Sequence, residues 1–89
     1  MPGKVVLMQN DPNPFNPHTV ISYHLSTESR VELTIYDLNG AVVATPIHTV
    51  QPAGEYRISF QSGYIPSGLY ICRLITDNRV YTRKMIHVR

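Results

Sequence analysis

The chain has few of the residue patterns from which reactive sites are built. Its single cysteine, Cys72, excludes an internal disulfide. Its four histidines show no His-x-x-x-His spacing, and no Cys-x-x-Cys pair is present, so zinc-type sites are not predicted. The histidines are His18, His24, His48 and His87. No nucleophile with a base and no pair of carboxylates stands out. We therefore expect no enzyme activity, no metal, no cofactor and no small-molecule substrate.

Long apolar runs are also missing. The apolar residues 5–8 are far shorter than the roughly 7 to 15 residues of a signal-peptide core. No stretch reaches the roughly 20 apolar residues of a membrane-spanning helix. The 89 residues are enough for one domain with a thin core. We expect residues 1–89 to be a single domain and a fragment of a larger secreted protein.

The sequence does contain the period-2 alternation of β-strands. With 43% hydrophobic and 16% charged residues, a folded chain is expected rather than a disordered one. No segment has a useful 3.6-residue stripe, whereas apolar and polar residues alternate in successive short segments. The predicted strands are residues 5–8, 21–25, 30–37, 42–50, 55–61, 69–76 and 79–89. Seven short strands with regular turn signals predict an all-β, Ig-like antiparallel sandwich, with a small barrel as the alternative.

Several residues carry local predictions within this pattern. Gly40, Gly54 and Gly68 are the turn glycines, each placed between two predicted strands. Pro46 lacks a backbone donor, so its strand should lie at a sheet edge or contain a bulge. The strand 69–76 is apolar on both faces and should lie near the middle of a sheet, with Cys72 buried.

A proline-rich arm, residues 11–17, precedes the second strand. Proline fixes φ and keeps the preceding residue out of the α region, so an extended, stiff arm is expected. Its structural residues are Pro12, Pro14, Phe15 and Pro17. Phe15 is the only large apolar side chain among them and is expected to enter the core. Asp11, Asn13 and Asn16 could offer oxygens to calcium, but turn bonding explains them better.

The order of the motifs resembles a known family. The run PNPFNP is followed by T-x-I-x-Y-x-L at 19–25 and V-x-L-x-I-Y-D-x-x-G at 31–40. A-G-x-Y follows at 53–56, P-S-G-x-Y at 66–70, and a basic and apolar strand at the end. Together these motifs resemble the C-terminal sorting domains of bacterial type IX secretion. The Ig-like domain of the flagellar hook-capping protein is similar in pattern and shares the sandwich without the export role.

The resemblance implies a function and a set of partners. It implies a non-catalytic module that directs a larger cargo protein through the type IX machinery, with an outer-membrane translocon and a sortase-like component as partners. The implied location is the cell surface or the medium, reached through the periplasm and outer membrane of a Gram-negative bacterium. The alternative is a structural Ig-like spacer or a carbohydrate-binding accessory domain of a secreted enzyme. We expect the isolated domain to be a monomer.

Basic residues gather near the end of the chain, where no acidic residue follows Asp77. Our candidate receptor contact is Arg83, Lys84, Met85 and Arg89. We expect the last strand to lie at a sheet edge, with outward side chains and free backbone groups accessible to a partner. The other interpretation is that these charges only discourage aggregation between sheet edges. Nucleic acid binding is not predicted, because a recognition helix and a run of stacking aromatics are both missing.

Overall fold

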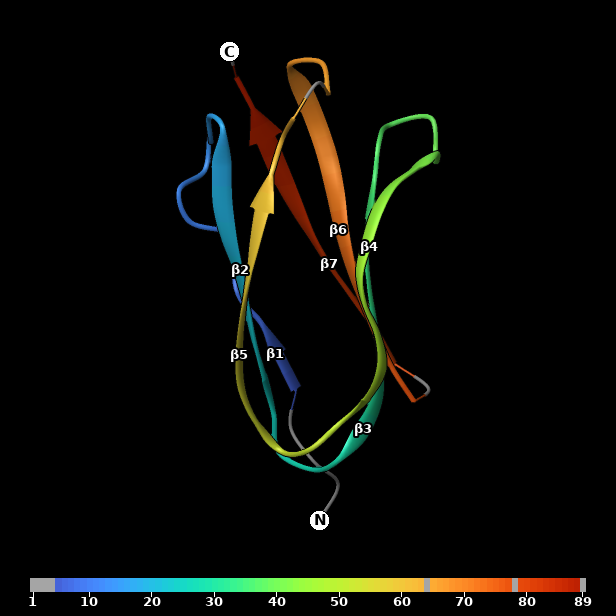
Figure 1. Ribbon diagram of the computed structural model, residues 1–89. Helices are drawn as coiled ribbons and strands as arrows, with labels where there is room; N and C mark the ends of the chain where they lie inside the picture. Colours follow the sequence, from blue (N-terminus) through green and yellow to red (C-terminus); the bar gives the residue numbers. More distant parts are fainter. Residues whose placement is uncertain (1–4, 64, 78, 89) are drawn as a thin grey trace.

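A computed structural model describes residues 5–63, 65–77 and 79–88, and Figure 1 shows them as two layers of strands. The seven strands of this part of the chain are β1 (Val5–Leu7), β2 (His18–Leu25), β3 (Ser29–Tyr36), β4 (Val42–Gln51), β5 (Gly54–Gln61), β6 (Gly68–Thr76) and β7 (Arg79–His87). The predicted all-β class is therefore confirmed, with the expected segments forming the strands.

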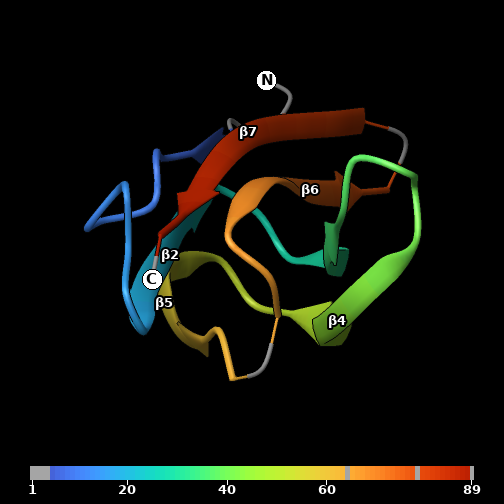
Figure 2. The ribbon, with the colours of Figure 1, turned by 90° about the horizontal axis from the view of Figure 1, so that it is seen from above.

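The strands form two antiparallel sheets that pack face to face. One sheet has the order β1-β2-β5 and the other the order β4-β3-β6-β7. The chain changes sheet between β2 and β3, between β4 and β5 and between β5 and β6. Seen from above in Figure 2, β7 runs along one side of the sandwich, passes the short β1 of the other sheet and ends near β2. This arrangement confirms the predicted sandwich and places the last strand at a sheet edge.

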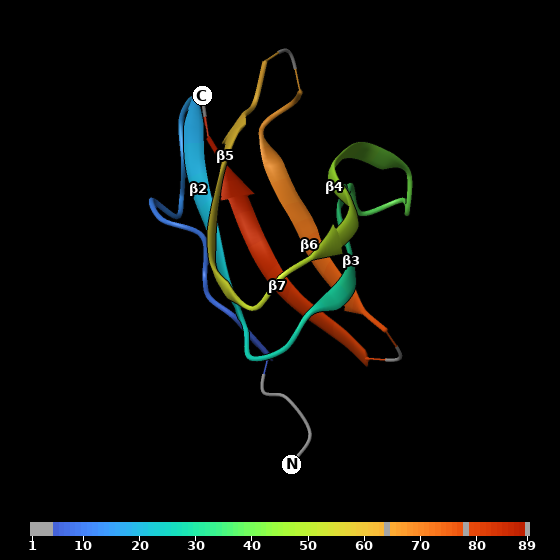
Figure 3. The ribbon, with the colours of Figure 1, turned by 60° about the horizontal axis from the view of Figure 1, so that its bottom comes forward.

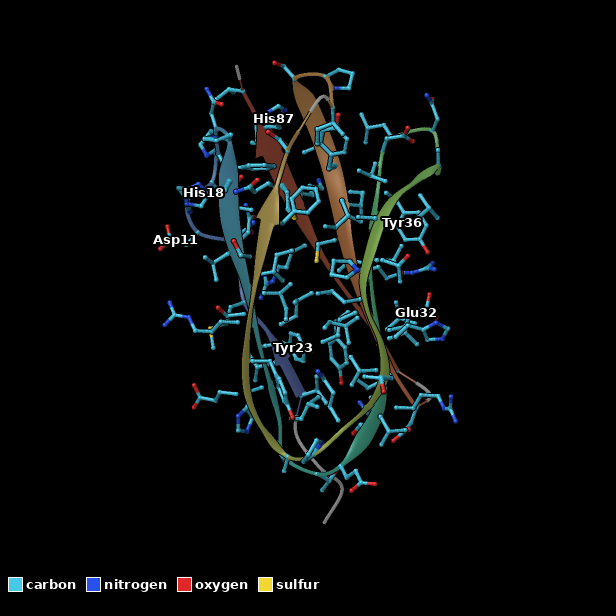
Figure 4. The ribbon with its side chains drawn as sticks, viewed as in Figure 1. Asp11, His18, Tyr23, Glu32, Tyr36 and His87 are labelled. Carbon is cyan, nitrogen blue, oxygen red and sulfur yellow. The ribbon has the colours of Figure 1, made fainter. Side chains whose placement is uncertain are left out.

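Alternation along the strands produces the core between the sheets. In β6, Tyr70, Cys72 and Leu74 are buried, whereas Ile71 and Arg73 on the other face are half-buried. In β2, the core face includes Tyr23, which lies between the two layers in Figure 4 and stacks on Tyr56. The buried apolar side chains are Leu7, Phe15, Ile21, Tyr23, Leu25, Val31, Leu33, Ile35, Phe60, Tyr70, Cys72, Leu74 and Met85.

Pro46 lies where its chemistry predicts. It is in β4, the edge strand of the four-stranded sheet. Leu33 pairs with Ile47 and Ile35 pairs with Ala44, so β4 contains one residue more than β3 across this interval. The irregularity includes Pro46, which has no N–H to donate to a ladder. The sequence predicted either an edge position or a bulge for this strand, and the structure has both.

Two corners of the sandwich have the same construction. The sequences PAGEY at 52–56 and PSGLY at 66–70 share the pattern P-x-G-x-Y. In each, the tyrosine hydroxyl donates a hydrogen bond of 2.6 Å to the proline carbonyl four residues earlier. The glycine between them begins a strand with φ of 152°, a conformation that side-chain-bearing residues rarely adopt. The third predicted turn glycine, Gly40, has φ of 84° in the β3–β4 turn.

Candidate functional site: the arm and the edge of the last strand

The proline-rich arm is folded back on itself and is not the straight extended segment that we expected. Its residues 12–14 and 16–17 are bends, and all three X-Pro bonds that precede Pro12, Pro14 and Pro17 are cis. Asp11 forms an antiparallel bridge with Val20 of β2, with N–H to O distances of 3.0 and 2.9 Å. The arm therefore leaves β2 and returns to it, as the loop beside β2 in Figure 3 illustrates.

Buried polar side chains hold this loop closed. Thr19 donates from Oγ1 to the carbonyl oxygen of Pro12 at 2.8 Å, and Asn10 donates from Nδ2 to the same oxygen at 3.2 Å. Asn10 Nδ2 also lies 3.1 Å from Thr19 Oγ1. These two buried side chains supply donors to a backbone carbonyl that is not paired in a strand ladder. Each proline restricts the backbone of the residue before it, but this local restriction does not prevent the chain from reversing its direction. The expectation of an extended arm was wrong for this reason.

Phe15 lies at the tip of the loop and is buried. Its ring meets Phe60 edge to face, with centroids 6.1 Å apart, and lies 5.1 Å from the ring of His87. Nδ1 of His87 is 3.2 Å from the carbonyl oxygen of Pro66, the same oxygen that accepts from Tyr70. The arm is thus packed against the end of β7, and His87 connects it to the second P-x-G-x-Y corner.

The arm and Gln9, which precedes it, cover the outer edge of β7. Phe15 donates from its N–H to the Ile86 carbonyl at 2.9 Å, and Val88 donates to the Phe15 carbonyl at 3.1 Å. Asn13 accepts the N–H of Ile86 at Oδ1, 2.8 Å away, and Gln9 donates from Nε2 to the Lys84 carbonyl at 2.6 Å. The expectation of free backbone groups is therefore wrong for this half of β7, because the arm and Gln9 already bond to them.

The four candidate contact residues do not share one environment. Lys84 is exposed on the outward face of β7. Arg83 is on the other face, where its Nε donates to the Leu7 carbonyl of β1 at 2.9 Å. Met85 is fully buried, so its side chain is not part of a contact surface, because in a strand the residue next to an outward one points inward. Arg89 lies outside the described residues.

The outward face of β7 instead carries apolar side chains beside Lys84. Ile86 is 41% exposed and Val88 is 43% exposed, and both lie on the same side of the strand as Lys84. Together Lys84, Ile86 and Val88 form a small mixed surface, which we call the β7 surface. The sequence predicted the position of this surface but included Met85 where Ile86 lies, because the mixed composition of residues 79–89 does not show which side chains face outward.

The described part of the chain offers little for catalysis or metal binding. It has no group of three or more His, Cys, Asp or Glu side chains placed to hold a metal ion. Cys72 is buried, and desolvation raises the pKa of its thiol to about 12, so the reactive thiolate is disfavoured. Over the same residues, no helix has both the length and the apolar character needed to cross a membrane.

Comparison with known families decides what kind of domain this is. The family model described as the secretion system C-terminal sorting domain matches residues 12–88, from the arm through the described end of β7. The chain belongs to this family. The sorting domain is a C-terminal signal for type IX secretion, and it marks a secreted or cell-surface protein. It implies an interaction with the type IX machinery, and domains of this kind are generally non-catalytic. No curated protein and no solved structure matched the chain.

The most informative residue that the sequence did not reveal is Asn13. It was interpreted as a local turn residue, yet its side chain bonds to a backbone group 73 positions away. The repeated Asn-Pro pairs indicate an unusual loop, but nothing in them identifies Ile86 as a partner. Long-range pairing of this kind depends on the packed fold.

Proposed function

We propose that the export machinery recognises the folded sorting domain through the β7 surface and the adjoining basic residues. The components in question are the outer-membrane translocon and the sortase-like component, and the route is through the periplasm of a Gram-negative cell. The observation that supports this proposal most directly is the packing of the arm against the edge of β7. There the arm covers the backbone edge, so the outward side chains are held on a fixed framework.

The composition of the β7 surface supports this role. Lys84 supplies a charge that can speed encounter with a partner, whereas Ile86 and Val88 supply apolar area that can be buried in the complex. Arg83 and Arg89 are the further candidates for this contact. Arg83 binds Leu7 only through Nε, so among the bonds seen in the described residues its remaining nitrogens have no partner.

The domain is one part of a longer exported protein in this proposal. Residues 1–89 act as a single domain attached to a larger cargo, and the isolated domain is a monomer. It acts by being recognised and not by catalysis, so cofactors and substrates have no role in it. The cargo differs from one protein to another, while the sorting domain supplies the export signal.

The test uses a reporter fused to the 89-residue chain in a host with type IX secretion. The variant is Arg83→Ser, Lys84→Ser and Arg89→Ser together, and the matched control is Arg30→Ser, Arg57→Ser and Arg79→Ser, which removes the same charge elsewhere. Exposed charges contribute little to stability, so both should melt within a few degrees of the parent. We expect surface display to fall for the variant and not for the control. Equal display of all three proteins would overturn the proposed contact.

A further inference from the structure

A shallow groove crosses the outer face of the four-stranded sheet, away from the core. It consists of two hollows of about 310 and 420 Å³. The first hollow is lined by Gln9, Ile71, Thr82, Arg83 and Lys84. The second is lined mainly by Tyr36, Asp37, Leu38, Ile71, Arg73 and Thr82. Because Ile71 and Thr82 line both hollows, the two join into one surface feature, which we call the outer groove.

Arg73 has an unusual position in this groove. Its guanidinium lies over the ring of Tyr36, with Cζ 4.6 Å from the ring centroid, and its Nη2 donates to the Tyr36 hydroxyl. Figure 4 shows Tyr36 on the outer side of the sheet. Nε of Arg73 is buried and has no partner among the described residues. A guanidinium has five N–H donors, and a carboxylate can pair with two of them at once. Because Nε is buried, a carboxylate from outside would pair with the terminal Nη groups, one of which already donates to Tyr36.

The charges around the groove are predominantly positive. Arg73 and Lys84 line it from the outer face and Arg83 lines it from the other face of β7, and no ion pair involves any of the three within the part of the chain that the structure describes. Asp37 is the acidic residue of the lining, but its Oδ1 already accepts the backbone N–H groups of Asn39 and Ala41. The groove thus has an excess of positive charge.

Glu32, an acidic residue of the same strand as Tyr36, does not neutralise the positive charge of the groove. Glu32 is on the outer face of β3, but its Oε1 is 4.0 Å from Nε2 of His48. Its other oxygen accepts from Thr34 Oγ1 at 3.3 Å. Figure 4 shows Glu32 toward the β4 side of the sheet. The carboxylate that would complement Arg73 is therefore not supplied by Glu32.

The spacing of the cations fits an extended peptide. Arg73 pairs across the sheet with Thr82, and Lys84 is two residues further along β7. The Cα atoms of such diagonal neighbours are about 7–8 Å apart, and the Arg73 guanidinium reaches from its Cα toward Tyr36 on β3. Side chains on one face of an extended chain recur at a similar distance, since each residue advances about 3.3 Å. An extended segment with an acidic side chain at every second residue could therefore reach Arg73 and Lys84 together.

We propose that the outer groove binds an extended acidic segment of a partner protein. Arg73 pairs with one carboxylate, Lys84 pairs with the next, and Ile71 forms the apolar floor. Leu38, which is 66% exposed at the rim, covers the segment from the side of the β3–β4 turn. That this partner is a component of the export machinery rests on the proposed function. The chemistry of the groove is tested separately from it.

The first experiment measures peptide binding by NMR with the labelled 89-residue chain. The probe is a capped pentapeptide in which glutamate alternates with threonine, and the control peptide has glutamine in place of each glutamate. We expect the glutamate peptide alone to shift the amide signals of Ile71, Arg73 and Thr82. Arg73→Gln and Lys84→Gln should each weaken binding about tenfold, as expected for loss of a charge-assisted bond. The matched control Arg57→Gln, on the other sheet, should bind like the parent.

Two results would overturn the inference. One is a parent domain whose groove signals do not move with the glutamate peptide, and the other is binding that Lys84→Gln leaves unchanged. Lys84 is exposed, so its variant keeps the proposal testable even if Arg73→Gln disturbs the fold.

The second experiment measures surface display of reporter fusions that carry Arg73→Gln or Arg57→Gln. We expect display to fall only for Arg73→Gln, and display equal to the parent would contradict the role of the groove in export. Failure of the proposed function is a distinct result, because then the Arg83, Lys84 and Arg89 triple variant would be displayed like the parent, whatever Arg73→Gln does.

Discussion

Phe15 and His87 pack ring against ring where the arm meets β7, with centroids 5.1 Å apart and an interplanar angle of 38°. The backbones of the same two residues form an isolated parallel bridge. A residue near the start of the chain thus completes the edge of its last strand. The surface assigned to recognition depends on this joint, because the arm holds β7 from the side opposite β6.

Removal of the Phe15 ring should therefore weaken the whole domain. Phe15→Ala deletes a fully enclosed aromatic side chain, and we expect a loss of about 3 to 5 kcal/mol in the free energy of unfolding. Urea unfolding followed by circular dichroism measures this. Phe15→Leu, which keeps most of the apolar volume, is the control and should lose much less. A midpoint for Phe15→Ala within error of the parent would show that the arm is not part of the cooperative fold.

The side chain of Asn13 should protect the edge of β7 specifically. Asn13→Ala removes the acceptor of the Ile86 N–H, and the expected cost is about 0.5–1.5 kcal/mol. Hydrogen exchange of the Ile86 amide should become faster, while amides of β2 keep their rates. Asn16→Ala is the matched control, since the structure gives the Asn16 side chain no hydrogen bond among the described residues. Unchanged exchange at Ile86 in Asn13→Ala would contradict this role.

The two P-x-G-x-Y corners should differ in strength. Tyr70 is buried and Tyr56 is half-buried, although both donate 2.6 Å bonds to a proline carbonyl. We expect Tyr70→Phe to cost about 1 to 1.5 kcal/mol and Tyr56→Phe to cost less, since solvent can replace the second bond. Denaturant midpoints of the two variants compare them directly. A larger loss for Tyr56→Phe would contradict the assignment of the Pro66 corner as the stronger one.

The buried thiol predicts a dependence of stability on alkaline pH. The pKa of Cys72 rises from its ordinary 9.0 to about 12 on folding because burial disfavours the thiolate. The contribution of the neutral thiol to the free energy of unfolding is complete below pH 9. It is lost as the pH rises toward 12, because the thiol of the unfolded chain ionises at a lower pH than that of the folded chain. Between pH 8 and pH 10 the expected loss of stability is about 1.4 kcal/mol.

The comparison that isolates the thiol is the parent against Cys72→Ala. Urea midpoints at pH 8 and pH 10 should fall more for the parent than for the variant. Tyr23, whose pKa burial raises to about 12, begins to contribute only near pH 10 and is present in both proteins. Equal losses in the two proteins would show that Cys72 ionises as easily in the folded state as in the unfolded one.

The architecture was predictable because its signals are local. Alternation in segments such as residues 30–37 follows directly from the pleat, so the strands and their inward faces are readable from the sequence. Pro46 and Gly40 carry backbone constraints that act at their own positions. Even the burial of Phe15 follows from a single aromatic residue among polar and proline neighbours.

The details of the candidate site were not predictable because they are long-range. The inward direction of Met85 depends on the register of β7 against β6, which the mixed composition of the last strand does not reveal. The closing of the arm depends on Asn10 and Thr19, two ordinary polar residues in the sequence. Arg73 did give a signal, as a charged residue within an apolar central strand, but its ring contact with Tyr36 exists only once β3 and β6 pair.

The most direct test of the account is the location of a reporter that carries the sorting domain. The reporter, preceded by its own signal peptide, is expressed with and without the 89-residue chain in a type IX host and in the same host lacking the translocon. The accessibility of the reporter to protease added outside intact cells is then measured. The account predicts surface-accessible reporter only when both the domain and the translocon are present. Reporter retained in the periplasm despite the domain, or exposed without the translocon, would contradict it.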